Sequence, residues 1–313
     1  MTNKPAWLHR FLSVSSSKRI YQESFPREIR IETINSCNSS CSFCPMGVNS
    51  EATKNRQVKR MDDALFRKII DEMASVSYSG IVKFYCNNEA LLDRRIVEFI
   101  EYTKEKLPHL TRLQIDTNGK LLTRELGASL FNAGLTCMLV DDYTETGGGG
   151  LNNKKEKIKE VYDWLREQFP DKTMGYFPRL LNEVLDSRAG MAPNNSYIPP
   201  APTKASCVYP FYSMYITSNG NVAQCHYDSV FENPMGNVTS SSLQEVWQGE
   251  KFRQLRAGLL KCSRTNKLCT QCDFHGHINP LEIMENTHYL YNFAYKSLGT
   301  LAKIRQIMKS SKV

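Results

Sequence analysis

The sequence contains no apolar run of the roughly 18 residues that a membrane-spanning helix requires, although 41% of its 313 residues are hydrophobic. It also shows no secretory signal peptide, because the short hydrophobic stretch at 7–12 is interrupted by His9 and Arg10. Residues 1–22 contain no Asp or Glu and are rich in serine, which faintly resembles a transit peptide. We expect instead a leader helix that packs on the domain, and a cytoplasmic protein without a membrane span.

The chain also lacks the regular cysteine spacing of a secreted disulfide framework. Its ten cysteines are spread unevenly, and two groups stand out: CxxxCxxC at Cys37, Cys41 and Cys44, and CxxC at Cys269 and Cys272. In a reducing compartment such groups are typical of metal sites. A chain of this length forms one large domain, or a domain of about 200 residues with a smaller companion.

Two kinds of binding motif are missing as well. The glycine run at 147–150 does not follow the GxxxxGK[ST] pattern of a phosphate loop, and no basic stretch is interleaved with aromatic residues, so nucleic acid is not an expected partner. The net charge is nevertheless +8, and residues 1–60 carry ten Lys or Arg against four Asp or Glu. This excess is either a solvated face or a docking surface for an acidic partner. The basic residues that follow the first cysteine group are Lys54, Arg56, Lys59 and Arg60.

Strand and helix periods alternate through the first two thirds of the chain. Residues 29–34 alternate apolar and polar side chains as a half-buried strand does, and Asp62 precedes apolar residues at helical spacing. Further strands are predicted at 81–85, 113–117, 137–140 and 174–177, and further helices between 96 and Pro108, at about 123–133 and at about 154–168. Such alternation predicts parallel strands with right-handed crossovers, which is the α/β class.

Polar segments follow four of these predicted strands, at the ends where α/β folds place their chemistry. The segments are the cysteine loop at 37–44, Asn87-Asn88-Glu89, Asn118-Gly119 and Asp141-Asp142. We therefore expect them to converge on one pocket. Asp141 and Asp142 either contact a substrate or cap the end of their strand.

The composition changes near residues 193–202, which are rich in proline and indicate a linker. Beyond it, apolar runs at 213–217 and 222–225 flank Asn219-Gly220, a strong hairpin pattern. We predict five segments: a leader helix or extension at 1–28, an α/β domain at 29–190, a linker at 191–206, a metal-binding domain at 207–280 and a helical tail at 281–313.

The first cysteine loop favours iron–sulfur chemistry. Three thiolates on one short loop hold three corners of an iron–sulfur cube, and without a fourth ligand nearby one iron stays open to a small molecule. A zinc loop with a distant fourth ligand is the alternative. The spacing and the position after a strand favour the open cluster.

With these residues in view, the chain resembles the radical S-adenosylmethionine (SAM) superfamily over nearly its whole length. The resemblance implies a partial (βα)6 TIM-like barrel whose CxxxCxxC loop holds a [4Fe–4S] cluster that binds SAM and cleaves it to a 5′-deoxyadenosyl radical. It places Phe43 next to the adenine and Asn118 near the ribose or carboxylate of SAM. It also places Asn87, Asn88 and Glu89 at the amino group of SAM, where the family has Gly-Gly-Glu; the two asparagines add bulk where glycine permits close backbone approach.

The second cysteine group resembles the twitch half of the SPASM domain. Cys207, Cys225 after the Gly220 hairpin, and the pair Cys269 and Cys272 match that pattern. The resemblance implies an auxiliary [4Fe–4S] cluster held by four thiolates in the C-terminal twitch domain. On the residues alone, a zinc site with four cysteine ligands is the rival interpretation.

Within the family, the chain is similar to dehydrogenases of aminocyclitols, in which a hydrogen atom leaves a carbinol carbon and the auxiliary cluster takes the second electron. Their substrate-contacting arginine matches Arg188, and their substrate-contacting acid falls at Tyr227, with Asp228 one place later. The resemblance therefore implies oxidation of a sugar or aminocyclitol. An acidic electron donor such as flavodoxin or ferredoxin would feed the first cluster.

Three cysteines, Cys86, Cys137 and Cys262, lie outside both groups. Cys137 lies on a predicted strand and is expected in the core. Cys86 or Cys262 could donate a hydrogen atom to a substrate radical, which would turn dehydrogenation into epimerisation. A peptide substrate and a zinc-binding module without catalysis are the remaining alternatives.

Overall fold

The computed structural model describes residues 24–39, 41, 44–45, 57–143, 154–178, 187–191, 206–229, 231 and 234–274. All of them fall within the first of the chain's two compact units, Met1–His277. The predicted tail at 281–313, nearly all of the predicted leader and linker, Phe43 and the glycine run at 147–150 lie outside the described residues.

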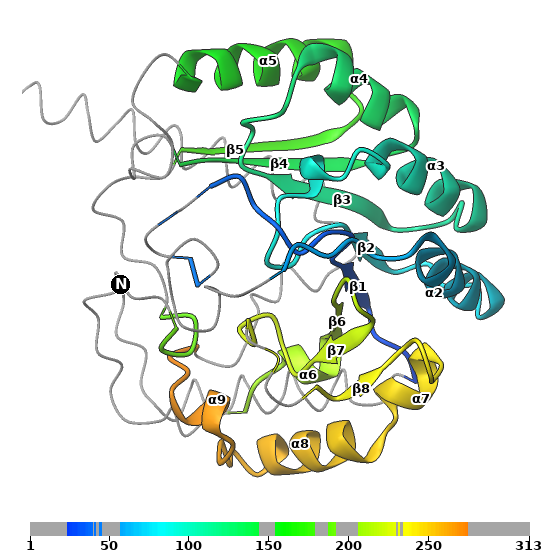
Figure 1. Ribbon diagram of the computed structural model, residues 1–313, viewed down its shortest axis with the longest axis vertical. Coiled ribbons are helices and arrows are strands. Elements are labelled where there is room, and N and C mark those ends of the chain that lie inside the picture. Colours follow the sequence, from blue (N-terminus) through cyan, green and yellow to red (C-terminus); the bar gives the residue numbers. More distant parts are fainter. Residues whose placement is uncertain are drawn as a thin grey trace, which may run out of the picture. The chain divides into compact units, whose positions relative to one another are not determined.

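One eight-stranded sheet runs through both predicted domains (Figure 1). Its strands are β1 (Glu28–Ile31), β2 (Ile81–Lys83), β3 (Arg112–Thr117), β4 (Cys137–Asp142), β5 (Thr173–Pro178), β6 (Ser213–Ile216), β7 (Asn221–Ala223) and β8 (Gly236–Asn237). Their order is β5-β4-β3-β2-β1-β6-β7-β8. The pairs from β5 to β6 are parallel, while β7 and β8 join antiparallel.

Helices follow the strands, as the alternating periods predict. They are α2 (Asp63–Ser75), the 3-10 turn η1 (Ala90–Leu92), α3 (Ile96–Lys106), α4 (Arg124–Asn132), α5 (Lys154–Gln168), α6 (Tyr209–Tyr212), α7 (Leu243–Trp247), α8 (Glu250–Leu260) and α9 (Lys267–Thr270). Asp62 caps α2 by accepting a hydrogen bond from the Ala64 amide, and Thr123 caps α4 in the same way. No helix in the described ranges is long and apolar enough to cross a membrane.

These elements confirm the α/β class. They also show that β6 is the sixth parallel strand. Strand β1 lies between two neighbours, since Ile29 pairs with Val82 of β2 on one side and with Met214 of β6 on the other. The predicted Asn-Gly hairpin is confirmed as β6–β7, with Gly220 at a φ of +81° in its turn. The hairpin of the second domain thus also supplies a strand of the first.

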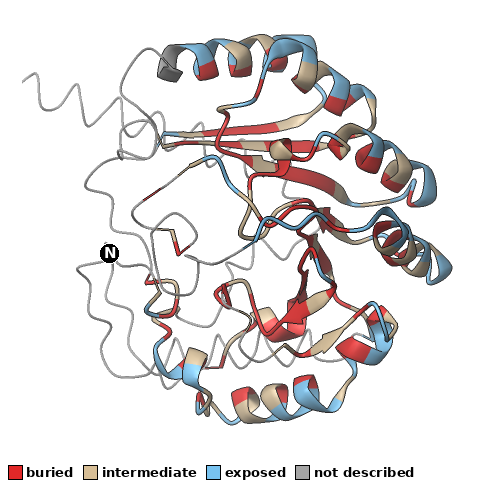
Figure 2. Cartoon of the chain, in the orientation of Figure 1, coloured by how far each residue is buried: buried red, intermediate tan, exposed pale blue. Residues whose placement is uncertain are grey.

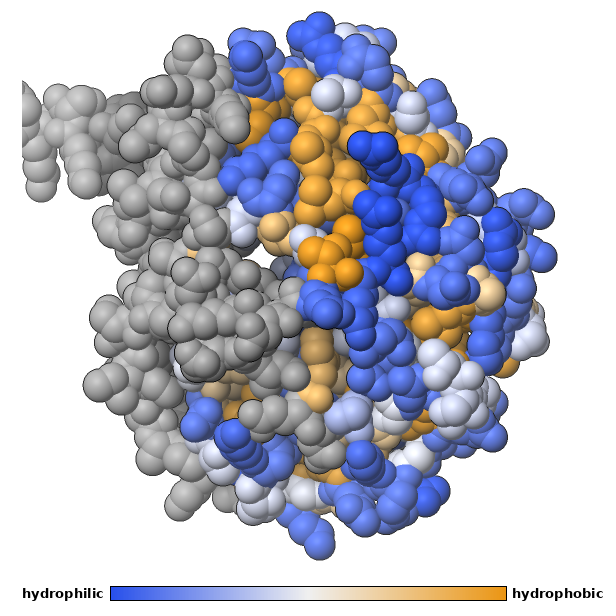
Figure 3. Space-filling view, viewed as in Figure 1, coloured by the Kyte–Doolittle hydropathy of each residue, from blue (hydrophilic) through white to orange (hydrophobic). Residues whose placement is uncertain are grey.

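The core lies between the sheet and helices α2 to α5, which follow the same outer side of the strands (Figures 1 and 2). Helix α2 buries Phe66, Ile69, Ile70 and Met73, which share one helical face. Phe66 stacks on Phe99 of α3 with ring centroids 3.9 Å apart. The outward surfaces of the helices are mostly hydrophilic (Figure 3).

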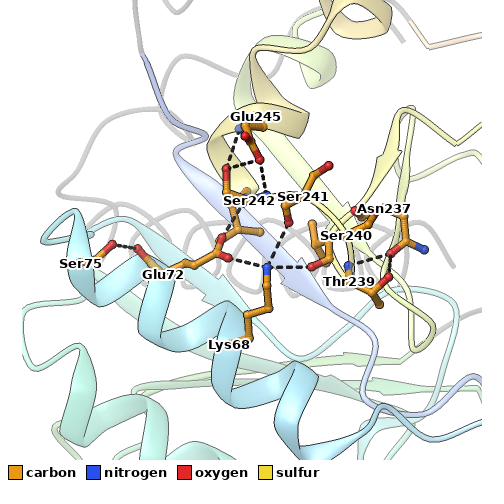
Figure 4. Close-up of polar contacts among 11 residues, drawn as sticks. Lys68, Glu72, Ser75, Asn237, Thr239, Ser240, Ser241, Ser242 and Glu245 are labelled. Atoms are coloured by element: carbon orange, nitrogen blue, oxygen red, sulfur yellow. Dashed lines mark hydrogen bonds and ion pairs between the residues drawn. The ribbon is translucent and has the colours of Figure 1, made fainter.

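Helix α2 is also bonded to the second domain (Figure 4). The Lys68 ammonium donates to the carbonyls of Val238 and Ser241 at 2.8 and 3.0 Å. Glu72, its ion-pair partner, accepts from the Leu243 amide at 2.8 Å. These bonds fix the segment before α7 against the barrel helix.

The inner face of the sheet is charged. Glu28 is 3% exposed, pairs with Arg30 at 2.6 Å and with Lys83 at 2.8 Å, and accepts a hydrogen bond from Ser213. Burial by itself would raise the pKa of Glu28, but the charges and hydrogen bonds of Arg30 and Lys83 outweigh it and hold that pKa well below its usual range. The side of the sheet that faces the barrel interior is therefore polar.

Candidate active site

A cavity lies at the carboxyl ends of the parallel strands. Its lining comes from the segments that follow β1 and β2, from the last residues of β3 and β4 and those just after them, and from one residue beyond β5: Cys37, Ser39, Cys41, Cys44, Tyr85, Cys86, Asn87, Asn88, Glu89, Asp116, Thr117, Asn118, Asp141, Tyr143 and Arg188. The predicted convergence of the four polar segments is therefore confirmed.

The first cysteine loop forms one wall of this cavity. Cys37, Cys41 and Cys44 are free thiols, and the Cys44 amide donates to the Cys41 carbonyl at 3.1 Å. Burial, followed by the neighbouring Cys44 and Cys37 thiols, raises the pKa of Cys41 to about 12. Thiols gathered in this way resist ionisation without a counter-charge, and a bound cationic metal group supplies that charge.

Glu89 holds the ends of β2 and β3 together. Its carboxylate is 2% exposed and accepts from the Thr117 hydroxyl at 2.8 Å, the Asn118 amide at 2.8 Å and the Leu91 amide at 3.1 Å. Burial raises the pKa of Glu89 above its ordinary value, against these hydrogen bonds, which favour the charged form. Most of its acceptor capacity is thus used inside the protein.

Asn118 in turn organises the cysteine loop. Its side-chain amide donates to Asn38 at 2.8 Å and to Ser39 at 3.1 Å, and it lies 3.7 Å from the Cys37 sulfur. The hydrogen bonds that link Glu89, Asn118 and the cysteine loop therefore fix the position of the Cys37 thiol.

The two asparagines in place of glycine have separate contacts. Asn88 accepts from the Cys86 amide at 2.9 Å through Oδ1, while its buried Nδ2 has no hydrogen-bond partner among the described residues. Asn87 accepts from the Ser229 hydroxyl at 3.3 Å. Since Ser229 lies four residues after Cys225, this bond joins the cavity loop to the second cysteine group.

Of the three residues for which the resemblance or the hydrogen-donor hypothesis predicts a catalytic role, Arg188, Tyr227 and Cys262, all within the described residues, Arg188 alone lines the cavity. Tyr227 is 4% exposed and is not among the lining residues; the Arg188 guanidinium lies over its ring, 5.9 Å from the centroid. Asp228 accepts from the Phe231 amide at 3.0 Å, so its carboxylate stabilises its own loop. Cys262 follows helix α8 and does not line this cavity. The substrate and donor roles of these residues stay predictions.

The remaining candidates divide clearly. Cys86 and Asp141 line the cavity. Asp142 is 1% exposed and accepts from the Tyr176 hydroxyl at 2.5 Å, which is a structural contact. Cys137 is 1% exposed on β4, as expected for a core residue.

The second cysteine group forms one electrostatic unit. Burial, followed by the neighbouring Cys207, Cys269 and Cys272 thiols, raises the pKa of Cys225 well above its ordinary value. Cys225, Cys269 and Cys272 are buried and Cys207 is half-buried, and the Gln224 side chain donates to the Cys269 sulfur at 3.2 Å. Four thiols clustered in this way fit a metal group that ionises them.

Besides Cys86 and Arg188, four lining residues fall outside the segments that the sequence predicted to converge, namely Tyr85, Asp116, Thr117 and Tyr143. Asp116 carried a usable signal, because it shares one face of β3 with the polar residues Arg112 and Gln114, opposite the apolar Leu113 and Ile115. Its carboxylate accepts from the Gln114 side chain at 2.5 Å.

Three comparisons bear on the identity of this site. A family model described as SPASM, an iron–sulfur cluster-binding domain, matches residues 207–273. The S-adenosyl-L-methionine-dependent 2-deoxy-scyllo-inosamine dehydrogenase of Niallia circulans is 30% identical over 248 residues, which cover 78% of this chain and 92% of the relative. The crystal structure of BtrN in complex with AdoMet and 2-DOIA matches with a TM-score of 0.68 and 27% identity, over 80% of this chain and 94% of that chain.

A more distant structure has the same fold. Native anSMEcpe with bound AdoMet is 14% identical, with a TM-score of 0.50, over 91% of this chain and 100% of that chain. The structural neighbours confirm the predicted α/β partial barrel with a twitch-type domain. Together with the family model, the relationship to the dehydrogenase shows that the chain belongs to the radical SAM enzymes with a SPASM/twitch-type auxiliary domain, oxidoreductases that use SAM and [4Fe–4S] clusters.

Proposed function

We propose that this enzyme oxidises a carbinol carbon of an aminocyclitol or sugar to a ketone. The observation that carries the proposal is the placement of Arg188. Its side chain lines the cavity that also holds the Cys37–Cys44 loop, and its guanidinium lies over Tyr227, which packs with Cys225 and Cys272 of the second thiol group. A substrate bound at Arg188 would therefore lie between the two thiol groups.

The cysteines divide into two ligand sets under this proposal. Cys37, Cys41 and Cys44 would hold the cluster that binds SAM, and Cys207, Cys225, Cys269 and Cys272 would hold the auxiliary one. When bound, these groups supply the 5′-deoxyadenosyl radical and the acceptor for the second electron. Asn87, Asn88, Glu89 and Asn118 would form the SAM side of the cavity, with Phe43 beside the adenine.

The protein's own residues fit a polyhydroxylated, amine-bearing substrate. Asp116 and Asp141 offer carboxylates, Tyr85 a hydroxyl and Arg188 a guanidinium on the same cavity. Within the described residues, Asp116 accepts one hydrogen bond, from the neutral side-chain amide of Gln114, and forms no ion pair. The related dehydrogenase acts on an aminocyclitol, 2-deoxy-scyllo-inosamine.

The proposal is tested on protein reconstituted anaerobically with iron and sulfide. We expect about eight irons per chain, as two cubanes require. An aminocyclitol deuterated at the carbinol carbon should transfer deuterium to 5′-deoxyadenosine and give one ketone per SAM consumed. SAM consumption without ketone would refute the oxidation, and zinc in place of iron would leave only a zinc-binding module.

A redox-neutral epimerisation is the second candidate, because Cys86 lines the cavity and is therefore placed to donate a hydrogen atom. This reaction would put solvent deuterium into the product and would stop after one turnover in Cys86→Ala. Cys262→Ala is the matched comparison, since Cys262 does not line the cavity.

The reductant is proposed to be a small acidic protein such as flavodoxin or ferredoxin. Lys59 and Arg60 are exposed after the cysteine loop, while Lys54 and Arg56 lie outside the described residues, as does most of the proline-rich segment that a peptide substrate would use. Reversing the charges of Lys59 and Arg60 should slow reduction by a flavodoxin and leave reduction by dithionite unchanged.

A further inference from the structure

The turn that carries Arg188 has an unusual backbone. Arg188, Ala189 and Gly190 follow one another with φ values of +48°, +56° and +82°. Glycine adopts this left-handed region freely, but residues with a Cβ atom are disfavoured there. Two such residues in succession persist only where the surrounding structure holds them in place.

Asp273 provides that hold from the second domain. Its carboxylate accepts from the Ser187 amide through Oδ2 and from the Ser187 hydroxyl through Oδ1, both at 2.8 Å. The same hydroxyl accepts from the Gly190 amide at 3.1 Å, which closes the turn. Hydrogen bonds to a carboxylate are stronger than those between neutral groups, so this anchor is well suited to oppose backbone strain.

Burial fixes the direction in which the turn faces. Ala189 is 0% exposed and packs in an apolar cluster with Cys225, Tyr227 and Cys272. With Ala189 on the inner side, Arg188 lines the cavity and its guanidinium lies over Tyr227. Any relaxation of the turn would move the guanidinium.

We infer that Asp273 is a positioning residue, which holds Arg188 in the cavity through Ser187 and the left-handed turn. Because Asp273 directly follows Cys272, the second thiol site and the presentation of Arg188 are mechanically coupled. The second domain would then help to bind substrate as well as to accept its electron. This inference rests on the proposed function in that Arg188 is taken to bind substrate.

The first experiment measures the anchor without substrate. In the reconstituted enzyme, Asp273→Ala and Ser187→Ala should each speed hydrogen–deuterium exchange in peptides spanning 187–191 and leave those of β1 to β4 unchanged. Asp171→Ala, at an exposed aspartate before β5, is the control. Ser187→Ala touches no residue of the thiol groups, so it remains informative if Asp273→Ala loses iron. Unchanged exchange in both variants overturns the anchor.

The second experiment measures what the anchor does. We expect Asp273→Ala to raise KM for the aminocyclitol roughly ten- to hundredfold, the effect of losing hydrogen bonds to a charged group. SAM affinity, iron content and the electron paramagnetic resonance spectra of both clusters should stay unchanged. In an Arg188→Gln background the same change should have almost no further effect, because the two residues act through one another.

The outcomes separate the inference from the function. Faster exchange with an unchanged KM, or additive effects of the two substitutions, would overturn the role in substrate binding. If the wild-type enzyme oxidises no aminocyclitol, the proposed function fails and the exchange data alone decide whether Asp273 holds the turn.

Discussion

Replacing Asn88 by aspartate tests the polarity of the cavity with almost no change in shape. The Cys86 amide can only donate, so the Asn88 atom facing it at 2.9 Å must be the carbonyl oxygen. The NH2 group therefore faces away, and it is buried without a partner in the part of the chain that the structure describes. Asn88→Asp keeps the first contact and replaces a donor by an anionic acceptor.

The expected magnitude follows from that unpaired donor. A buried polar group without a partner costs about 1–3 kcal/mol, and a hydrogen bond to a charged group contributes about 1.5–3 kcal/mol. If a carboxylate or hydroxyl oxygen of SAM or of the substrate accepts from Asn88, the aspartate loses that bond and adds repulsion. The affinity should then fall roughly ten- to hundredfold, since about 1.4 kcal/mol corresponds to a factor of ten.

Equilibrium dialysis of the reconstituted enzyme measures both ligands, first SAM alone and then substrate in the presence of SAM. Asn132→Asp, at the exposed end of α4, is the matched control. Asn88→Ala removes both contacts but adds no negative charge. If repulsion matters, the alanine should therefore weaken binding less than the aspartate. Wild-type affinity in Asn88→Asp would show that Asn88 only supports the Cys86 backbone. Tighter binding would show that the ligand presents a donor, such as an ammonium group.

Three further substitutions test the clusters and the fold. Cys207→Ala should lower iron from about eight to about four per chain while SAM still binds, as colorimetric iron assay and dialysis would show. Phe66→Ala removes a fully buried ring, and denaturant unfolding should show a loss of about 3–5 kcal/mol; a loss below 1 kcal/mol would mean that the core collapses around the gap. Glu28→Gln leaves Arg30 and Lys83 without their counter-charge, so we expect a loss of about 3 kcal/mol, near the lower end for buried pairs because both cations keep some solvent contact.

Much of the barrel could be predicted because its local patterns agree with its tertiary structure. The helix predicted at about 154–168 is α5, Lys154–Gln168, and the predicted strand 113–117 differs from β3 by one residue. Asp62 is the cap that its position before α2 indicated. In each case the period, the cap and the burial favour the same element.

The pairing of β6 with β1 could not be predicted in this way. The segment 213–217 reads as the first strand of a hairpin, and nothing local says which strand lies on its other side. That choice depends on contacts between residues nearly 200 positions apart, such as Ile29 and Met214. The same limit hid Tyr85, whose functional position is set by the neighbouring strands and not by a motif.

For Tyr227, alignment and geometry lead to different roles. The resemblance placed a substrate-contacting acid at this position, but the side chain is buried beneath Arg188 and does not line the cavity. The neighbouring acid, Asp228, is occupied by its own loop. If the reaction needs a protein carboxylate that contacts the substrate, Asp116 or Asp141 is better placed to supply it, because both line the cavity from β3 and β4.

The pairing of β1 with β6 limits which parts of such an enzyme can vary when its substrate specificity changes. Strand β1 leads to the Cys37–Cys44 loop, and β6 continues through its hairpin to Cys225, so one cysteine of the second group is linked through paired strands to the first group. The bonds Asn87–Ser229 and Ser187–Asp273 join the cavity to residues beside Cys225 and Cys272 at two further points. Moving Cys225 away from the first cysteine loop would strain these connections. We therefore expect specificity to vary through the side chains that line the cavity.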